Sequence, residues 1–110
     1  MKWQVNYIDS AYKDLKRLDN SQRLLVIKAI EKVSANPVPI TMGGYGKPLG
    51  NKRVKNLTGF YKIKIRDSGL RVVYDLILKD EQMRIIIISI RTDEEVYKIA
   101  AKRASLLKKE

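Results

Sequence analysis

The order of hydrophobic and polar residues predicts a strand, a pair of helices, a group of strands and a final helix. Near the start, Trp3, Val5 and Tyr7 alternate with polar residues. A period of two is typical of a strand, which we expect to end near Ile8. Helical spacing follows this strand, and strand-like runs fill most of the second half of the chain. The pattern therefore predicts an α+β fold.

Two helices are predicted directly after the first strand, because apolar residues recur there every three or four positions. The first helix begins at a cap on Asp9 or Ser10 and ends around Asp19-Asn20. The second begins at a cap on Ser21 and ends before Asn36-Pro37, since a residue that precedes proline disfavours helical geometry. The first third of the chain is thus expected to be a strand followed by a helical hairpin.

The segment from Pro37 to Gly50 is predicted to be a loop, because it contains all three prolines and four of the six glycines. Strand-like runs follow it and should form an antiparallel meander. Tight turns are expected at Thr58-Gly59 and Ser68-Gly69, and a looser turn between the last two runs. The four predicted strands are Val54 to Leu57, Phe60 to Arg66, Leu70 to Leu78 and Met83 to Ile90.

The last third of the chain combines a wholly apolar run with a helix start. The run from Ile85 to Ile88 would be apolar on both faces, which predicts a central strand that is covered on both sides. Thr92 is followed three residues later by Glu95, a spacing typical of the capping box that begins a helix. Leu106 and Leu107 near the end either continue the buried stripe of this helix or lie exposed.

Composition limits the chemistry that is possible. The chain has 110 residues, 45% of them hydrophobic and 32% charged, which predicts one domain over residues 1–110. It has neither cysteine nor histidine, so thiolate and imidazole metal ligands and the commonest general base are absent. We expect no metal and no small-molecule cofactor. We also expect no membrane segment and no signal peptide, and therefore a cytoplasmic protein.

The net charge of +11 is concentrated in one window. If residues 60–66 form a strand, Lys62, Lys64 and Arg66 point to one face. A row of cations without acids repels itself until a polyanion neutralises it, and this predicts binding of nucleic acid. Lys52, Arg53 and Lys55 are expected to add unspecific phosphate affinity. The window contains seven cations and no acid: Lys47, Lys52, Arg53, Lys55, Lys62, Lys64 and Arg66.

The register of one hairpin decides whether Arg71 joins this face. A two-residue turn at Ser68-Gly69 would pair Arg66 with Arg71 and place Arg71 among the cations. A three-residue turn would put Arg71 beside Ile65 on the opposite face. We favour the two-residue turn, because it keeps the opposite face apolar and suits a phosphate clamp.

Three stretches of the chain resemble the RelE/ParE toxin superfamily, and its RelE branch most closely. They are Lys47-Pro48-Leu49, the run from Tyr61 to Tyr74, and Arg91 with Tyr97 six residues later. The resemblance covers nearly the whole chain. It implies a RelE-like fold and a toxin of a type II toxin-antitoxin system, held inactive by a cognate antitoxin protein. It further implies a ribosome-dependent endoribonuclease that cuts mRNA in the decoding site. Carried over position by position, it implies a catalytic set of Lys62, Lys64, Arg71, Arg91 and Tyr97.

These five side chains also suit RNA cleavage on chemical grounds, because attack of the 2′-hydroxyl on its phosphate builds up negative charge. Arg71 could clamp the phosphate oxygens with its fork of donors. Lys64 is a candidate base or charge stabiliser for the 2′-hydroxyl, and Lys62 would support it. Arg91 could neutralise the leaving oxygen, and Tyr97 could stack on a base or position one.

Structural interpretations of the same residues remain open. Lys62, Lys64 and Arg66 could form the solvated face of a sheet, and Tyr97 could belong to the core. Arg71 could pair with Asp75 or a helix carboxylate, and Arg91 could bind Asp93 or Glu94. Two other functions also remain. The ParE branch shares the fold and poisons DNA gyrase by protein contact. A non-catalytic RNA-binding module would keep its affinity for RNA without cleavage.

Overall fold

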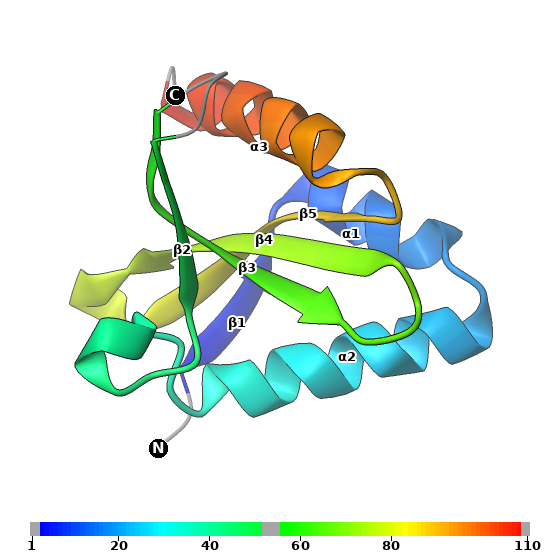
Figure 1. The fold of residues 1–110 in the computed structure, drawn as a ribbon, viewed down its shortest axis with the longest axis horizontal. Coiled ribbons are helices and arrows are strands. Elements are labelled where there is room, and N and C mark those ends of the chain that lie inside the picture. Colours follow the sequence, from blue (N-terminus) through cyan, green and yellow to red (C-terminus); the bar gives the residue numbers. More distant parts are fainter. Residues whose placement is uncertain (1–2, 52–55, 109–110) are drawn as a thin grey trace.

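A computed structural model describes residues 3–51 and 56–108 of the chain. One five-stranded sheet, with the strand order β1-β5-β4-β3-β2, has helices on both faces (Figure 1). The predicted α+β fold and its order of elements are confirmed. The strands are β1 (Gln4–Tyr7), β2 (Lys47–Asn51), β3 (Asn56–Ile65), β4 (Leu70–Ile77) and β5 (Gln82–Ser89). The helices are α1 (Asp9–Arg17), α2 (Asn20–Ser34) and α3 (Asp93–Lys108), with short 3-10 turns at η1 (Ile40–Met42) and η2 (Leu78–Asp80).

The sheet separates two layers of buried side chains. Helices α1 and α2 cover one face, and α3 crosses the other face (Figure 1). The first layer joins Ala11, Leu15, Val26 and Ile30 of the helices to Val72, Tyr74 and Ile85 of the sheet. The second joins Val96, Tyr97 and Ala100 of α3 to Leu57, Val73, Ile86 and Ile87. Each face of the sheet thus has its own helical cover.

Strand β5 is interior and buried on both sides, as the apolar run from Ile85 to Ile88 predicts. It pairs in parallel with β1 and antiparallel with β4. Its register with β4 shifts between Val73 and Tyr74, which leaves Ile86 as an extra residue in β5. This bulge turns Ile86 and Ile87 toward α3, while Ile85 and Ile88 face the other helices.

A buried ion pair completes the edge of β5 beyond the end of β1. The Asp14 carboxylate on α1 accepts a hydrogen bond from the backbone N–H of Ile88 at 3.1 Å. Arg103 on α3 donates to Asp14 at 2.7 Å and to the carbonyl of Ile86 at 2.9 Å. These two side chains satisfy backbone groups that a longer β1 would otherwise pair, because β1 reaches only as far as Ile85.

The start of the meander differs from the prediction. Strand β2 lies within the segment predicted to be a loop, and it pairs antiparallel with β3. The predicted turn at Thr58-Gly59 is wrong, because β3 continues through it from Asn56. Gly59 has a φ of +89° and lies where the register between the two strands shifts. Glycine therefore marks a bulge here, not a chain reversal. Val54 and Lys55 of the predicted strand lie outside the described residues.

The hairpin between β3 and β4 also has a different turn. Ile65 pairs with Leu70 across a four-residue turn, so neither the two-residue nor the three-residue turn is correct. The Ser68 hydroxyl donates to the carbonyl of Ile65 at 2.8 Å, and both Asp67 and Gly69 have positive φ. These local bonds stabilise a wider turn. Because the register moves by two residues, the side chains that remain paired keep the predicted face, whereas Arg66 moves into the turn.

Two predicted helix starts are wrong. Helix α1 is preceded by Ile8, which makes no side-chain cap, instead of by a cap on Asp9 or Ser10. Helix α2 is capped by Asp19 in a capping box with Gln22, so Ser21 lies inside the helix. Asp19 accepts the backbone N–H of Gln22 at 2.8 Å and thereby satisfies a donor of the first turn.

The start of α3 agrees with the prediction, because the Thr92 hydroxyl accepts the backbone N–H of Glu95 at 3.3 Å. For Leu106 and Leu107 near its end, two positions were possible, in the buried stripe of the helix or exposed, and each leucine takes a different one. Leu106 is exposed, whereas Leu107 packs against the buried layer under α3.

Candidate nucleic-acid interface

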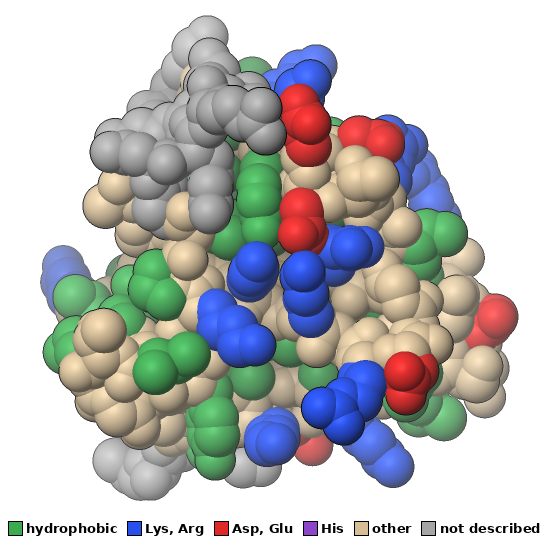
Figure 2. All heavy atoms as spheres, in the orientation of Figure 1, with side chains coloured by type: hydrophobic (Ala, Val, Ile, Leu, Met, Phe, Trp, Pro, Cys, Tyr) green, Lys and Arg blue, Asp and Glu red, His purple; other side chains and the backbone are tan. Residues whose placement is uncertain are grey.

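Four cations share the sheet face that α3 partly covers. Lys64 pairs directly with Arg71, and Lys62 pairs with Val73 on one side and Lys47 on the other. Cross-strand partners point to the same face, and Val73 belongs to the layer under α3. We call Lys47, Lys62, Lys64 and Arg71 the cationic cluster. Figure 2 shows Lys and Arg side chains gathered at the centre of this face, with acidic side chains beside them.

Tyr97 connects the cluster to the core. The residue is only 8% exposed and packs in the layer between α3 and the sheet. Its hydroxyl oxygen accepts a hydrogen bond from Lys62 Nζ at 3.1 Å, and the same nitrogen lies 5.8 Å from the ring centroid. The structural interpretation of Tyr97 as a core residue is therefore correct for the ring, while the hydroxyl reaches the cluster.

Asp93 neutralises two of the cations. A helix carboxylate was one of the expected partners of Arg71, but the contact that it shares with Lys64 was not expected. The Asp93 carboxylate lies 3.1 Å from Lys64 Nζ and 2.5 Å from Arg71 Nε. Partial burial alone would raise the pKa of Asp93, but hydrogen bonds and positive charge from Lys64 and Arg71 outweigh that effect and hold the pKa below its ordinary value of 3.8. Asp93 is the first residue of α3, so it also complements the helix dipole.

The Arg71 guanidinium is fixed on several sides. Besides the bond to Asp93, its Nη1 donates to the carbonyls of Gly69 at 3.0 Å and Arg91 at 2.8 Å. Arg71 therefore pairs with a helix carboxylate and not with Asp75. The Asp75 carboxylate accepts hydrogen bonds from Nε and Nη2 of Arg84, at 3.0 and 2.6 Å. That pair holds the pKa of Arg84 above its ordinary value, chiefly through the hydrogen bond.

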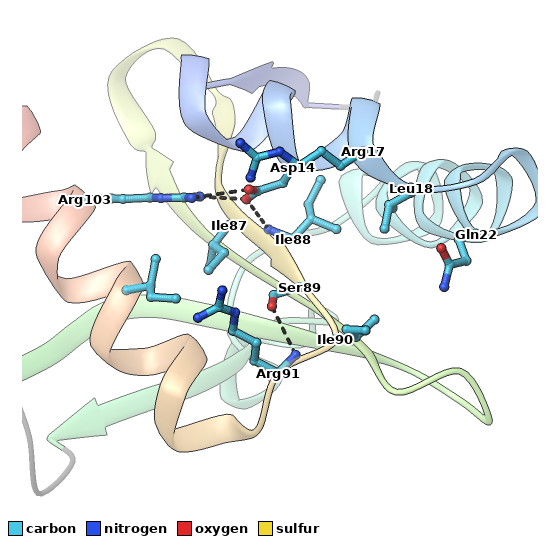
Figure 3. A pocket seen from close by; sticks show the side chains of 11 residues that line it. Asp14, Arg17, Leu18, Gln22, Ile87, Ile88, Ser89, Ile90, Arg91 and Arg103 are labelled. Carbon is cyan, nitrogen blue, oxygen red and sulfur yellow. Dashed lines mark hydrogen bonds and ion pairs between the residues drawn. The ribbon is translucent and has the colours of Figure 1, made fainter.

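Arg91 meets the cluster through its backbone, while its side chain lines a neighbouring pocket. Its carbonyl accepts from Arg71, and its N–H donates to the Ser89 hydroxyl at 3.1 Å. The pocket lies between α1, the end of β5 and α3, and Figure 3 shows Arg91 there together with Arg17 and Arg103. Among the described residues the side chain pairs loosely with Glu95, at 3.9 Å, and not with Asp93 or Glu94 as expected, which leaves it room to reorient.

The remaining predicted cations are distributed differently. Arg66 lies in the turn after β3 and is exposed, so it does not share the strand face with Lys62 and Lys64. Its proposed contact with RNA stays a prediction. Lys52, Arg53 and Lys55 lie outside the described residues.

The position of Asp93 follows from features that the sequence displays separately. Arg71 pairs with Ser89 near the end of β5, and α3 begins four residues later. An acidic residue in the first turn of α3 therefore lies close to the side chains of the neighbouring strand β4. The correct register of the hairpin, with Lys64 opposite Arg71, would have been needed to expect one carboxylate to contact both cations.

Chemically, the cationic cluster is a site for an oxyanion. It already binds the two oxygens of one carboxylate through an ammonium and a guanidinium group. Phosphate oxygens are bound by the same donors with similar geometry.

Within the residues that the structure describes, no helix has both the length and the apolar character needed to span a bilayer.

Comparison with known families and relatives gives one consistent group. The family described as "ParE toxin of type II toxin-antitoxin system, parDE" matches residues 5–97. A RelE-like toxin protein of Escherichia coli is 30% identical over 105 residues, which are 94% of this chain and 98% of the relative. The mRNA interferase toxin RelE of Escherichia coli strain K12 is 29% identical, with the same coverage.

Solved structures agree with these sequence matches. A doubly substituted Escherichia coli toxin RelE in the free state aligns with a TM-score of 0.73 at 27% identity, covering 94% of this chain and 98% of that one. The substituted toxin in complex with the antitoxin peptide RelBc aligns with a TM-score of 0.67 at 25% identity, covering 91% and 95%. The similarity therefore extends over nearly the whole length of both molecules.

Proposed function

The chain belongs to the ParE/RelE family of type II toxin-antitoxin toxins, and from this membership and the cationic cluster we propose that it is an endoribonuclease that cleaves translated mRNA. The observation that supports this proposal best is the direct pairing of Lys64 with Arg71, next to the bond between Lys62 and Tyr97. These contacts gather four of the five proposed catalytic side chains along one side of α3. The name mRNA interferase, borne by a relative of similar length, supports the same reaction.

In the proposed reaction, the 2′-oxygen of RNA forms a bond to the adjacent phosphorus and passes its proton to water, while the P–O5′ bond breaks and the 5′-oxygen takes up a proton from water. Arg71 binds the phosphate oxygens, and Lys64 stabilises the charge that develops near the attacking hydroxyl. Lys62 adds positive charge and is itself oriented by Tyr97. Arg91 turns out of its pocket to neutralise the leaving oxygen. Each role requires charge or a hydrogen bond, and no step requires a side chain with a pKa near neutrality.

In this proposal the ribosome supplies the orientation of the substrate, which the catalytic side chains alone do not provide. Catalysis that depends on electrostatic stabilisation requires the scissile phosphate to be held in line with the attacking hydroxyl. The cationic cluster lies on an open face, so it offers charge but little enclosure for a single nucleotide. We therefore propose that mRNA is cut in the decoding site, in the cytoplasm, where the ribosome holds the strand in position.

We further propose an antitoxin protein as the second partner. RelE structures are known both with the RelB antitoxin and with an antitoxin peptide. A chain with a net charge of +11 needs neutralisation when it is stored inactive. An acidic or amphipathic segment that folds on binding would supply this over the cationic cluster.

A second candidate function comes from the family description, which names ParE toxins. In that case the toxin would poison DNA gyrase by protein contact, and the pairing of Lys64 with Arg71 would contribute only to the charge of the surface. Gyrase supercoiling in the presence of the purified protein distinguishes this function from cleavage of mRNA.

The experiment that tests the proposal is primer extension on a translated mRNA after induced expression. Wild-type protein should produce new 5′ ends, whereas Arg71→Ala should reduce cleavage by about 100-fold, because one charge-stabilising group is lost. Lys28→Ala is the matched control: it also removes one positive charge, but it lies exposed on α2, across the sheet from α3. Intact mRNA together with blocked supercoiling would replace the proposed nuclease by the gyrase poison.

A further inference from the structure

The carboxylate of Asp93 occupies the cations that the proposed reaction needs for phosphate. It lies 3.1 Å from Lys64 Nζ and 2.5 Å from Arg71 Nε. The remaining Arg71 contacts are to the carbonyls of Gly69 and Arg91 through Nη1. Because both Nη1 bonds go to carbonyls, a phosphate that binds Arg71 with two parallel hydrogen bonds would have to use Nε and Nη2, and Nε already donates to Asp93.

We propose that Asp93 is an internal competitor of RNA, which occupies the phosphate position of the cationic cluster until an RNA phosphate displaces it. The inference rests on the proposed function for the chemical class of the ligand, single-stranded RNA. It does not depend on cleavage, because the competition concerns binding to Lys64 and Arg71.

Displacement of Asp93 requires only a change of its side chain. The backbone of α3 is fixed independently, by the capping bond between Thr92 and Glu95 and by the buried Val96. The side chains of Asp93, Lys64 and Arg71 are all partly exposed, at 34%, 47% and 24%. Ion pairs in such positions contribute little net stability, so a phosphate can replace the carboxylate at low cost.

Asp14, a second carboxylate that pairs with an arginine, illustrates the difference. Asp14 is only 9% exposed, binds Arg103, and also accepts the backbone N–H of Ile88. Releasing it would leave a buried charge and an unpaired backbone group. Asp14 is thus built into the sheet edge, whereas the contacts of the Asp93 carboxylate within the described residues are to the two cations Lys64 and Arg71.

This arrangement gives the free toxin two properties. The carboxylate reduces repulsion between Lys64 and Arg71, which are direct cross-strand neighbours. It also lowers the affinity for RNA, because an RNA phosphate must displace the Asp93 carboxylate before it can bind Lys64 and Arg71. Tight binding then requires further phosphate contacts, such as those of a strand held by the ribosome.

The test is the binding of a short 2′-O-methyl RNA, which has no free 2′-hydroxyl and cannot be cleaved. Fluorescence anisotropy over a series of salt concentrations should show that Asp93→Asn binds about fivefold more tightly than wild type. Its plot of log K against log salt should keep the wild-type slope, because the same phosphate contacts form once Asp93 has been displaced.

Glu94→Gln is the matched control. It removes one negative charge from the same helical turn, but Glu94 is exposed and pairs only loosely with Lys98 at 3.8 Å. This variant should change the affinity by less than about twofold, through long-range charge alone. Asp93→Ser is measured in parallel, because serine also suits the start of a helix and removes the same carboxylate.

If both Asp93 variants bind as Glu94→Gln does, or more weakly than wild type, the competitor role is overturned. Weaker binding would instead assign Asp93 to the positioning of Arg71. If wild type and variants all fail to bind the oligonucleotide, the RNA ligand of the proposed function fails as well. Binding by wild type with no gain in the variants would overturn the competition alone.

Discussion

The ammonium nitrogen of Lys62 lies 3.1 Å from the hydroxyl oxygen of Tyr97 and joins β3 to α3 at the cationic cluster. The two residues are 35 positions apart in sequence, and the tyrosine ring is buried while the lysine reaches toward solvent. The hydroxyl thus orients a flexible cation from a rigid position. Tyr97 therefore has two roles: its ring packs in the core, and its hydroxyl positions Lys62.

We predict that Tyr97→Phe lowers the rate of mRNA cleavage about tenfold, because loss of a hydrogen bond to a charged group costs roughly 1.5 kcal/mol of positioning energy. The free energy of unfolding should change by less than about 1 kcal/mol, since the ring still fills its place. Tyr97→Ala should instead destabilise the fold by about 3 kcal/mol. Primer extension and urea unfolding measure the two effects, and full activity of the phenylalanine variant would exclude the positioning role.

Arg103→Met should destabilise the protein by about 3 kcal/mol, because it leaves the buried Asp14 carboxylate without its partner. Thermal or urea unfolding measures the change. Lys102→Met provides the comparison, since Lys102 is the exposed neighbour on the same helix and should lose less than about 0.5 kcal/mol. Equal stability of the two variants would show that the ion pair does not support the edge of β5.

Acid should weaken the fold partly through Asp93. Its pKa is lower in the folded protein than its ordinary value of 3.8, so the unfolded chain takes up the proton first. The stabilisation is complete above that ordinary value and is lost as the pH falls through the lower folded value. In urea unfolding between about pH 5 and pH 2, Asp93→Asn should lose less stability than wild type. Glu94→Gln should follow wild type, and parallel curves for the asparagine variant would contradict the prediction.

Lys47→Ala should weaken binding of any single-stranded RNA and lower the slope of log K against log salt by about 0.7. The reason is that Lys47 pairs with Lys62 at the edge of the cationic cluster and lies exposed. Lys28→Ala on the opposite side of the molecule should leave the slope unchanged. If both variants reduce the slope equally, the charge of the whole surface, and not the cluster, determines binding.

The sequence by itself determined the order of the elements and the faces of their side chains. Alternation around Lys62 and Lys64 fixed their common face, and helical spacing fixed the buried side of α3, because both depend only on local periodicity. The isoleucine run identified β5 as an interior strand for the same reason. Even the wrong turn left Arg71 on the correct face, since the error in register was an even number of residues.

Only the tertiary structure decided which residues meet across the chain. The glycine at position 59 marks a bulge because β2 pairs there, and no local signal distinguishes such a bulge from a turn. Asp93 reaches both Lys64 and Arg71 because α3 starts beside the end of β5. Contacts of this kind depend on the packing of distant segments, which periodicity cannot encode. The charge of the site was therefore readable in the sequence, but the contact of one carboxylate with both cations was not.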